Sequence, residues 1–375
     1  MAFGTVQADV IGTSVAGSNI GAGNASIMKN RIINGAMVIS QYNGTSSVTP
    51  TTSAYVIDRW NAVVSQSSKL SFQQNAGSVT PPTGFSNYLG ATSLSTYSVV
   101  STDNFALQQS IEGFNFADLN WGTANAKTVT LSFQVYSSLT GTFGGSLANS
   151  NFDYSYPFTY TISSANTWTT ISVTIAGPTS GTWIGATNGI GLRLYIALGV
   201  GSTKSATAGS WQSGTYFSAT GATSVVGTSG ATFYITGVQL EVGSSATGFE
   251  YRQYGQELAL CQRYYEQSYS YGTVAGTATG TGSVVTAGNQ SAPTTNAIGA
   301  SSLFIVPKRT APTITIYDPV SGNSGVGSRT LFGSGATGNQ TVTSQGIGDK
   351  SWQVYSSSGV NANSIYYHYT ASAEL

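Results

Sequence analysis

The amino-acid sequence predicts an all-β protein. Charged residues make up only 7% of the 375 residues, whereas aromatic residues make up 11%. Disordered chains are poor in aromatics, so this composition indicates a folded protein. The 46 glycines, with many Ser and Asn, predict frequent turns and few long helices. Between these turns lie short runs of Thr, Val, Ile, Tyr and Phe, which have the composition of strands.

The clearest strand is predicted at residues 128–136, where apolar and polar side chains alternate. A period of two residues is typical of a half-buried antiparallel strand. The apolar face of this strand consists of Val129, Leu131, Phe133 and Val135.

Similar runs fill residues 29–250, which we assign to one jelly-roll β-sandwich. The first runs are RIINGAMVISQYN and AYVIDRWNAVVS, and TFYITGVQLEV predicts the last strand. Residues 1–28 are rich in Gly, Ala and Ser, with Asp9 as the only charge. They supply little for a core, so we expect an extended N-terminal arm or, as the alternative, a disordered tail.

Charged residues are concentrated in the segment that follows the last strand. Residues 251–268 place Leu258, Cys261 and Tyr265 at helical spacing, which predicts a short amphipathic connecting helix. A helix of about three turns is unstable alone and must pack on a neighbour. We expect its charged side chains to face solvent or a neighbouring subunit. Residues 269–375 then contain enough apolar runs for a smaller C-terminal β-domain.

Composition also excludes several classes of protein. The formal net charge is zero and no long basic run occurs, which argues against a nucleic-acid partner. No apolar run is long enough to cross a membrane, and residues 1–12 lack the features of a secretory signal. One cysteine allows no internal disulfide. We therefore expect synthesis in a cytoplasm.

The sequence offers little for catalysis. His368 is the only histidine and lies in a predicted strand, and Cys261 lies on the apolar face of the predicted helix. We interpret both as structural, and we expect no metal site and no cofactor. Paired carboxylates could still cleave a polysaccharide. The candidates, which form no motif, are Asp103, Glu112, Asp118 and Asp153.

Aromatic side chains are the remaining candidates for function, because their flat faces stack on sugar rings and anchor interfaces. Trp121, Trp183 and Trp211 fall in or beside predicted loops of the sandwich. In the C-terminal domain we expect the receptor or glycan-binding residues to be Trp352, Tyr355, Tyr366 and Tyr367.

Three stretches resemble a known family. They are GAGNASIMKNRIINGAMVISQYN with AYVIDRW, TWTTISVTIAGPTSGTW, and ITGVQLEVGSSATGFEYRQYGQELALCQRYYE with a terminal YTASAEL. Together they resemble bacteriophage tail-fibre or virion appendage proteins, over most of residues 20–267. The central domain also resembles jelly rolls of the carbohydrate-binding-module type. At the positions where such modules carry acidic calcium ligands, this chain has Thr236 and Gly237, so only backbone carbonyls could bind the ion.

The resemblance implies a structural virion protein, a homotrimeric tail fibre or spike. It implies that the arm docks to other virion proteins and that the far end meets a host-surface glycan or protein receptor, without enzymatic activity. By the same analogy, the connecting helix packs near a threefold axis, with subunit-interface residues Glu257, Leu258, Cys261 and Arg263. The alternatives are a capsid decoration protein and a polysaccharide-degrading spike.

Overall fold

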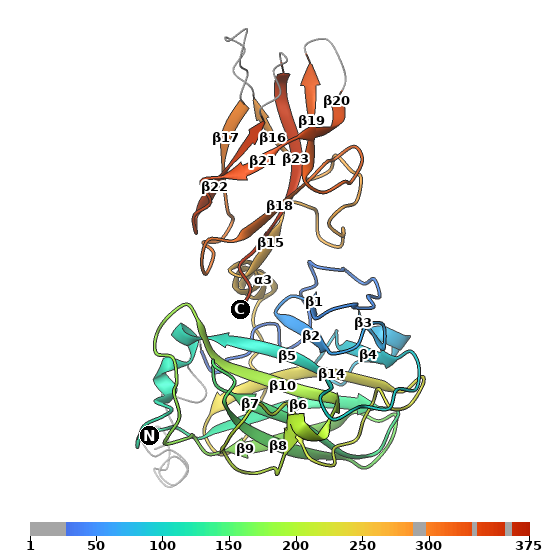
Figure 1. Ribbon diagram of the computed structural model, residues 1–375, viewed down its shortest axis with the longest axis vertical. Coiled ribbons are helices and arrows are strands. Elements are labelled where there is room, and N and C mark those ends of the chain that lie inside the picture. Colours follow the sequence, from blue (N-terminus) through green and yellow to red (C-terminus); the bar gives the residue numbers. More distant parts are fainter. Residues whose placement is uncertain (1–27, 288–297, 332–335, 357–361) are drawn as a thin grey trace, which may run out of the picture.

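The computed structural model describes residues 28–287, 298–331, 336–356 and 362–375. Two β-rich bodies are stacked along the long axis, with a short helix between them (Figure 1). The lower body is the central sandwich and the upper body is the C-terminal domain. The all-β prediction is therefore confirmed. The predicted N-terminal arm lies almost entirely outside the described residues.

The central sandwich consists of two antiparallel sheets that face each other. One has seven strands in the order β1 (Ala54–Ile57), β2 (Trp60–Val64), β5 (Asn104–Glu112), β10 (Ile190–Val200), β7 (Gly141–Ala148), β8 (Tyr154–Ile162) and β12 (Gln212–Ser213). The other has five, in the order β3 (Leu70–Gln74), β4 (Leu89–Ser93), β14 (Thr232–Val242), β6 (Val129–Ser137) and β9 (Thr169–Ile175). A short parallel pair, β11 (Ser205–Ala206) and β13 (Ser218–Ala219), lies beside them. Four single 3-10 turns are η1 (Ala76–Ser78), η2 (Gly113–Asn115), η3 (Ala117–Leu119) and η4 (Ser202–Lys204).

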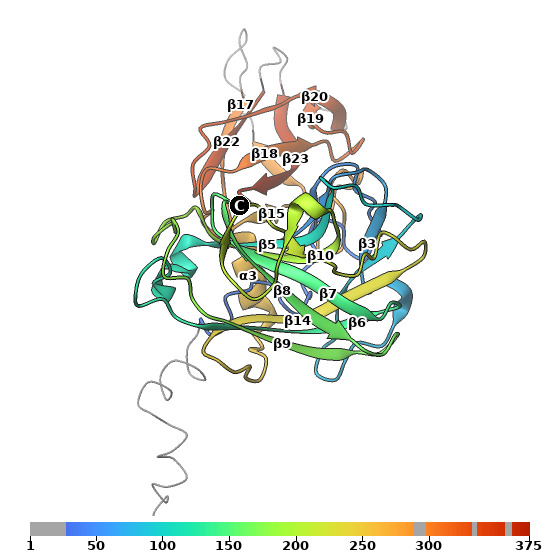
Figure 2. The same cartoon turned by 60° about the horizontal axis from the view of Figure 1, so that its bottom comes forward.

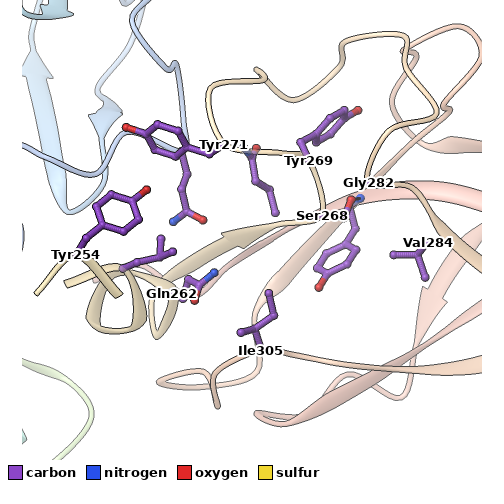
Figure 3. Close-up of a pocket in the computed structure, with 12 residues that line it drawn as sticks. Tyr254, Gln262, Ser268, Tyr269, Tyr271, Gly282, Val284 and Ile305 are labelled. Atoms are coloured by element: carbon purple, nitrogen blue, oxygen red, sulfur yellow. Dashed lines mark hydrogen bonds between the residues drawn. The ribbon is translucent and has the colours of Figure 1, made fainter. Parts of the chain in front are cut away.

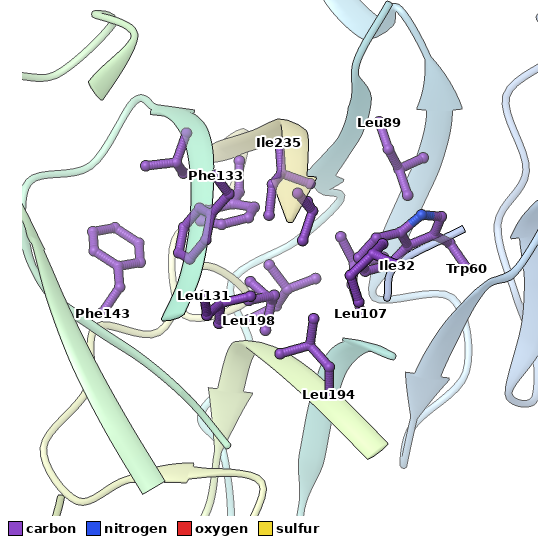
Figure 4. Packing of buried hydrophobic residues seen from close by; sticks show 14 of the residues in the cluster. Ile32, Trp60, Leu89, Leu107, Leu131, Phe133, Phe143, Leu194, Leu198 and Ile235 are labelled. Atoms are coloured by element: carbon purple, nitrogen blue, oxygen red, sulfur yellow. The ribbon is translucent and has the colours of Figure 1, made fainter. Parts of the chain in front are cut away.

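The core between the two sheets is formed by the alternating side chains that the sequence predicts. On β6, the four apolar side chains that alternate from Val129 to Val135 are all almost completely buried. They belong to one cluster with Leu107, Leu194 and Leu198 of the opposite sheet, and Figure 4 shows Leu131 and Phe133 in this cluster. Removing this apolar surface from water is the main stabilising term of the sandwich.

Residues 30–41 differ from the sequence-based prediction. They were expected to supply a strand but form turns and irregular backbone. Asn30 explains part of this, because its Oδ1 accepts hydrogen bonds from the backbone N–H groups of Ile32 and Leu240. Asn34, with a φ of 57°, uses its side chain to bind the backbone of Ile39 twice. Local side-chain hydrogen bonds thus replace a strand ladder.

The helix α3 (Tyr254–Gln262) is followed at once by β15 (Tyr265–Gln267), which pairs with the last strand of the C-terminal domain. The predicted helix was therefore too long. Tyr265 lies in a strand and does not share a helical face with Cys261.

The described residues of the C-terminal domain form two sheets. In the first, β15, β16 (Val284–Ala287), β18 (Thr313–Tyr317) and β19 (Val326–Leu331) all pair with the long β23 (Ala362–Ser372), and β20 (Ala336–Thr341) pairs with β19. The second has the order β17 (Ile298–Leu303), β22 (Ser351–Ser356) and β21 (Thr343–Gln345). The core of the domain, to which both sheets contribute, includes Ile316, Trp352, Val354 and Ile365.

The charged residues near α3 hold the two bodies together. Glu112 at the end of β5 accepts hydrogen bonds from Arg263 (2.6 Å) and from the hydroxyl of Tyr264 (2.6 Å). The buried Arg59 pairs with Glu374, next to the C-terminus. The side chain of Arg263 is still 32% exposed, so the expectation that it faces solvent or another subunit stays a prediction. Its partner is Glu112 of the central sandwich in the same chain, which lies 151 residues away in the sequence.

Candidate functional site

Four segments of the central sandwich meet at one end and bring five aromatic side chains together. Register places the start of β6 beside the end of β9, and the end of β7 beside the start of β8. The loops at this end therefore converge, and Trp121 and Trp183 come from two of them. Trp211 precedes β12 on the sheet edge, and Tyr154 and Tyr156 lie on β8.

The rings contact one another closely. Trp121, Trp183 and Trp211 are in edge-to-face contact, with ring centroids 5.0–5.4 Å apart. Tyr154 stacks on Trp211 at 5.7 Å with an interplanar angle of 13°, and Tyr156 approaches Trp211 at 5.3 Å. We call these five residues the tryptophan cluster. Trp121 is buried and forms its floor, whereas the other four are half-buried.

The polar atom of each indole is already used within the chain. The Nε1–H groups of Trp121, Trp183 and Trp211 donate to backbone carbonyls of Lys127 (2.8 Å), Ser180 (3.1 Å) and Ala176 (2.8 Å), respectively. These bonds fix the orientation of each ring. The partly exposed ring surfaces are therefore pre-oriented, and little side-chain entropy is lost when a ligand stacks on them.

Two glycines make the close packing possible. Gly122 and Gly181 have φ values of +83° and +90°, which side-chain-bearing residues rarely adopt. A Cβ at Gly122 would lie 2.8 Å from Trp183 Cδ1, and a Cβ at Gly181 would lie 2.9 Å from Tyr154 Cδ1. Both positions thus require glycine for conformation and for space.

Hydrogen-bonding groups lie beside the rings. Asn149 is buried and its Nδ2 donates to Asp153 (2.6 Å) and to the carbonyl of Thr182 (3.1 Å), which joins the β7–β8 turn to the Trp183 loop. Asp153 itself is exposed, as is Ser180, whose hydroxyl lies 3.1 Å from that of Tyr154. Flat aromatic surfaces with adjacent hydroxyl and carboxylate groups can bind the apolar faces and the hydroxyls of a sugar.

The C-terminal residues expected to contact a receptor are arranged differently. Trp352 and Tyr367 are fully buried in the core of that domain, so the expectation that they contact a receptor is wrong. Alternation along β23 turns Tyr367 inward, and Trp352 packs edge-to-face against it at 5.6 Å. Tyr355 and Tyr366 are half-buried, and their role stays a prediction.

The expected subunit-interface residues also contact their own chain. Cys261 is completely buried, and burial holds the pKa of its thiol well above the usual value. Glu257 is 7% exposed, pairs with Arg252 at 3.4 Å and accepts a hydrogen bond from the backbone of Asn34. The expectation that Glu257 and Cys261 face a neighbouring subunit is therefore wrong. Leu258 is half-buried and remains available.

The candidate carboxylates all have structural partners. Glu112 accepts hydrogen bonds from Arg263 and from the hydroxyl of Tyr264. Asp118 forms an ion pair with Arg31 at 2.8 Å. Asp103 accepts hydrogen bonds from the hydroxyls of Ser65 and Tyr97, each at 2.8 Å. Asp153 accepts a hydrogen bond from Asn149 and directly precedes Tyr154 of the tryptophan cluster.

His368 is buried in the C-terminal domain. Its Nε2 lies 2.9 Å from the carbonyl of Thr279, and its Nδ1 lies 2.9 Å from the hydroxyl of Ser268. Tyr269 stacks on the imidazole, with ring centroids 3.8 Å apart. Burial lowers the pKa of His368 below its usual value, so the ring is neutral at neutral pH. Nε2–H then donates to Thr279, and Nδ1 accepts from Ser268.

Within the described ranges, no three His, Cys, Asp or Glu side chains are grouped to hold a metal ion. In the same ranges no helix has the length and apolar character needed to cross a membrane.

Comparisons with known proteins give structural neighbours only. No protein-family model matches the sequence, and no curated protein matches it. A solved tailspike domain of bacteriophage CBA120 aligns with a TM-score of 0.31 and 10% identity, covering 57% of this chain and 22% of the tailspike chain. A sugar-binding protein described as putative, from Bacteroides thetaiotaomicron, gives a TM-score of 0.34 and 12% identity over 57% of this chain and 100% of its own. A family 11 carbohydrate-binding module from Clostridium thermocellum aligns with a TM-score of 0.26 and 11% identity. The alignment covers 51% of this chain and 91% of the module. At these TM-scores the likenesses carry no argument about ligand or activity.

Proposed function

We propose that this protein is a structural component of a bacteriophage virion, a tail fibre or spike that attaches to a glycan on the host surface without cleaving it. The observation that carries the binding part of this proposal is the tryptophan cluster, whose rings are fixed by internal hydrogen bonds and remain half exposed. The phage assignment is supported by the sequence resemblance described above.

The central sandwich, and not the C-terminal domain, is the proposed glycan-binding part. Trp183, Trp211 and Tyr154 present surfaces for stacking, and Asp153 and Ser180 supply hydrogen-bonding groups beside them. The chain has a net charge of zero, so we expect a neutral glycan whose binding changes little with salt. As a virion protein it would be a homotrimer, and three copies would raise a weak affinity per site by avidity. Residues 1–28 would attach it to the virion.

Binding of purified protein to immobilised surface polysaccharides of candidate hosts tests the proposal. Trp183→Ala and Trp211→Ala should each weaken binding by about tenfold or more, the loss expected for an aromatic anchor. Trp168→Ala is the matched control. This residue is also half-buried with its Nε1–H on a backbone carbonyl (Thr80, 2.9 Å), but it directly precedes β9, at the opposite end of that strand from the cluster.

Equal binding by both cluster variants and the wild type would refute this site. Release of shortened saccharides from the polysaccharide by the wild-type protein would refute the non-enzymatic part. Light scattering that gives a clean monomer at micromolar concentration would refute the trimer.

A further inference from the structure

A pocket that shares no lining residue with the tryptophan cluster lies where the two bodies meet. It is lined by Gln41 of the central sandwich, by Tyr254, Leu258 and Gln262 of α3, and by residues of the C-terminal domain that include Tyr271 and Tyr369. Figure 3 shows these side chains around the space between α3 and the C-terminal domain. Its volume is about 470 Å³, within the range of about 300–1,000 Å³ typical of small-molecule sites. We call it the junction pocket.

The junction pocket has no side chain in its wall that is charged at neutral pH. Its 12 lining residues include four tyrosines, three glutamines and a serine, but no Asp, Glu, Lys, Arg or His. Behind the wall, Glu266 pairs with Lys308 at 2.5 Å, and Asp58 accepts hydrogen bonds from Gln41 while burial raises its pKa to about 7. A charged ligand would therefore lose its hydration without gaining a counter-charge. The pocket favours a neutral ligand.

One buried acceptor in the wall has no hydrogen-bond partner among the residues that the structure describes. Gln267 is 6% exposed and its Nε2 donates to the carbonyl of Thr273 (3.1 Å), whereas its Oε1 accepts no hydrogen bond from any described residue. A buried acceptor left in this state costs on the order of 1–3 kcal/mol. A ligand hydroxyl in the pocket could donate to it. The side-chain amide of Gln262 is likewise unbonded within the described ranges and supplies a second polar group.

Two exposed tyrosines provide the apolar contact at the mouth. Tyr254 and Tyr271 are 49% and 59% exposed, and they contact each other edge-to-face at 6.0 Å. The hydroxyl of Tyr271 donates to the carbonyl of Val38 (3.3 Å), which holds the ring in place. These features together suit a neutral saccharide. The fixed aromatic rings can stack on the apolar face of a sugar, and the amide groups can bind its hydroxyls.

We propose that the junction pocket binds a neutral saccharide of one or two rings, independently of the tryptophan cluster. The Tyr254 and Tyr271 rings stack on the sugar, and Gln267 Oε1 accepts from one of its hydroxyls. Because Gln41 and Tyr369 come from different bodies, the bound saccharide also holds the two bodies together.

The experiment is a titration of the protein with saccharides. Saturation-transfer NMR detects binding, and calorimetry measures the affinity. The probes are galactose, mannose, N-acetylglucosamine, lactose and cellobiose, with glucuronate as the charged comparison. The variants are Tyr271→Ala, which removes an exposed ring, and Gln267→Met, which removes the amide at similar volume. Tyr251→Ala is the control, because that tyrosine is 61% exposed but does not line the pocket.

We expect at least one neutral saccharide to bind, with about tenfold weaker affinity in each pocket variant and unchanged affinity in Tyr251→Ala. The Trp183→Ala/Trp211→Ala double variant should retain this binding, which separates failure of this site from failure of the proposed function. The proposal is overturned if no neutral saccharide binds at about 10 mM, if Tyr271→Ala binds as tightly as the wild type, or if glucuronate binds as well as the neutral sugars.

Discussion

The central sandwich and the C-terminal domain each contain a cluster of Trp and Tyr, yet the two clusters differ in exposure. Around Trp211 four of the five rings are half-buried, Trp121 is buried, and every indole N–H has a partner. Around Trp352 the rings are buried, and Trp352 Nε1 finds no partner among the described residues. The first cluster comes mainly from loops and a sheet edge, whereas the second comes from the inward faces of β22 and β23.

This difference teaches that the position of an aromatic residue decides its role more than its type does. A ring on an alternating strand shares its face with the core and fills space there. A tryptophan ring on a loop can be fixed by a hydrogen bond from its Nε1–H and still leave part of the ring exposed to a ligand. The two clusters should therefore respond differently to mutation, and the following predictions test that difference.

The largest expected effect is on the stability of the C-terminal domain. Trp352→Ala should destabilise the domain by about 3–5 kcal/mol, because it leaves a large cavity in a packed core. Chemical denaturation followed by circular dichroism measures this loss. Trp211→Ala, at a half-buried position, should cost clearly less. Equal losses for the two variants would contradict the distinction between core and surface rings.

An intermediate effect is expected at the glycines of the tryptophan cluster. Gly181→Ala should destabilise the sandwich by about 1–3 kcal/mol, because its φ is unfavourable for alanine and its Cβ would press on Tyr154. Gly209→Ala is the control, since Gly209 has a similar φ of +94° with nothing within 4 Å. The difference between the thermal unfolding midpoints of the two variants measures the cost of packing a Cβ against Tyr154. Equal midpoints would show that this cost is absent.

The smallest effect concerns pH and the stability of the C-terminal domain. The folded-state pKa of His368 is lowered by burial, so the unfolded chain binds the proton more readily. The stability contributed by the neutral ring is present above about pH 6.5 and is lost as pH falls below it. Chemical denaturation from pH 7.5 to 5 should show this loss in the wild type and a smaller one in His368→Gln. A greater loss in the variant would show that another group is responsible.

Much of the fold could be predicted from the sequence because it depends on local alternation. The last strand of the sandwich was predicted at the residues that β14 occupies, and 128–136 differs from β6 by one residue. The loop positions of Trp121, Trp183 and Trp211 were also visible. Their mutual contact was not, because it depends on strand register between distant segments.

The roles of the charged residues could not be predicted for the same reason. Arg59 and Glu374 are 315 positions apart, and nothing local to either residue indicates the other. Trp352 was expected to bind a receptor because it is aromatic, although its alternation and that of Val354 with polar neighbours is a signal for an inward face.

The most direct test of the central claim uses the indole N–H signals of the six tryptophans in ¹⁵N-labelled protein. Each signal is assigned by single substitution and followed while the glycan identified by the binding assay is added. The account predicts that the signals of Trp183 and Trp211 shift in step with saturation, while those of Trp60 and Trp168 stay unchanged. Saturable binding that leaves Trp183 and Trp211 unshifted would contradict the assignment of the glycan site to the central sandwich.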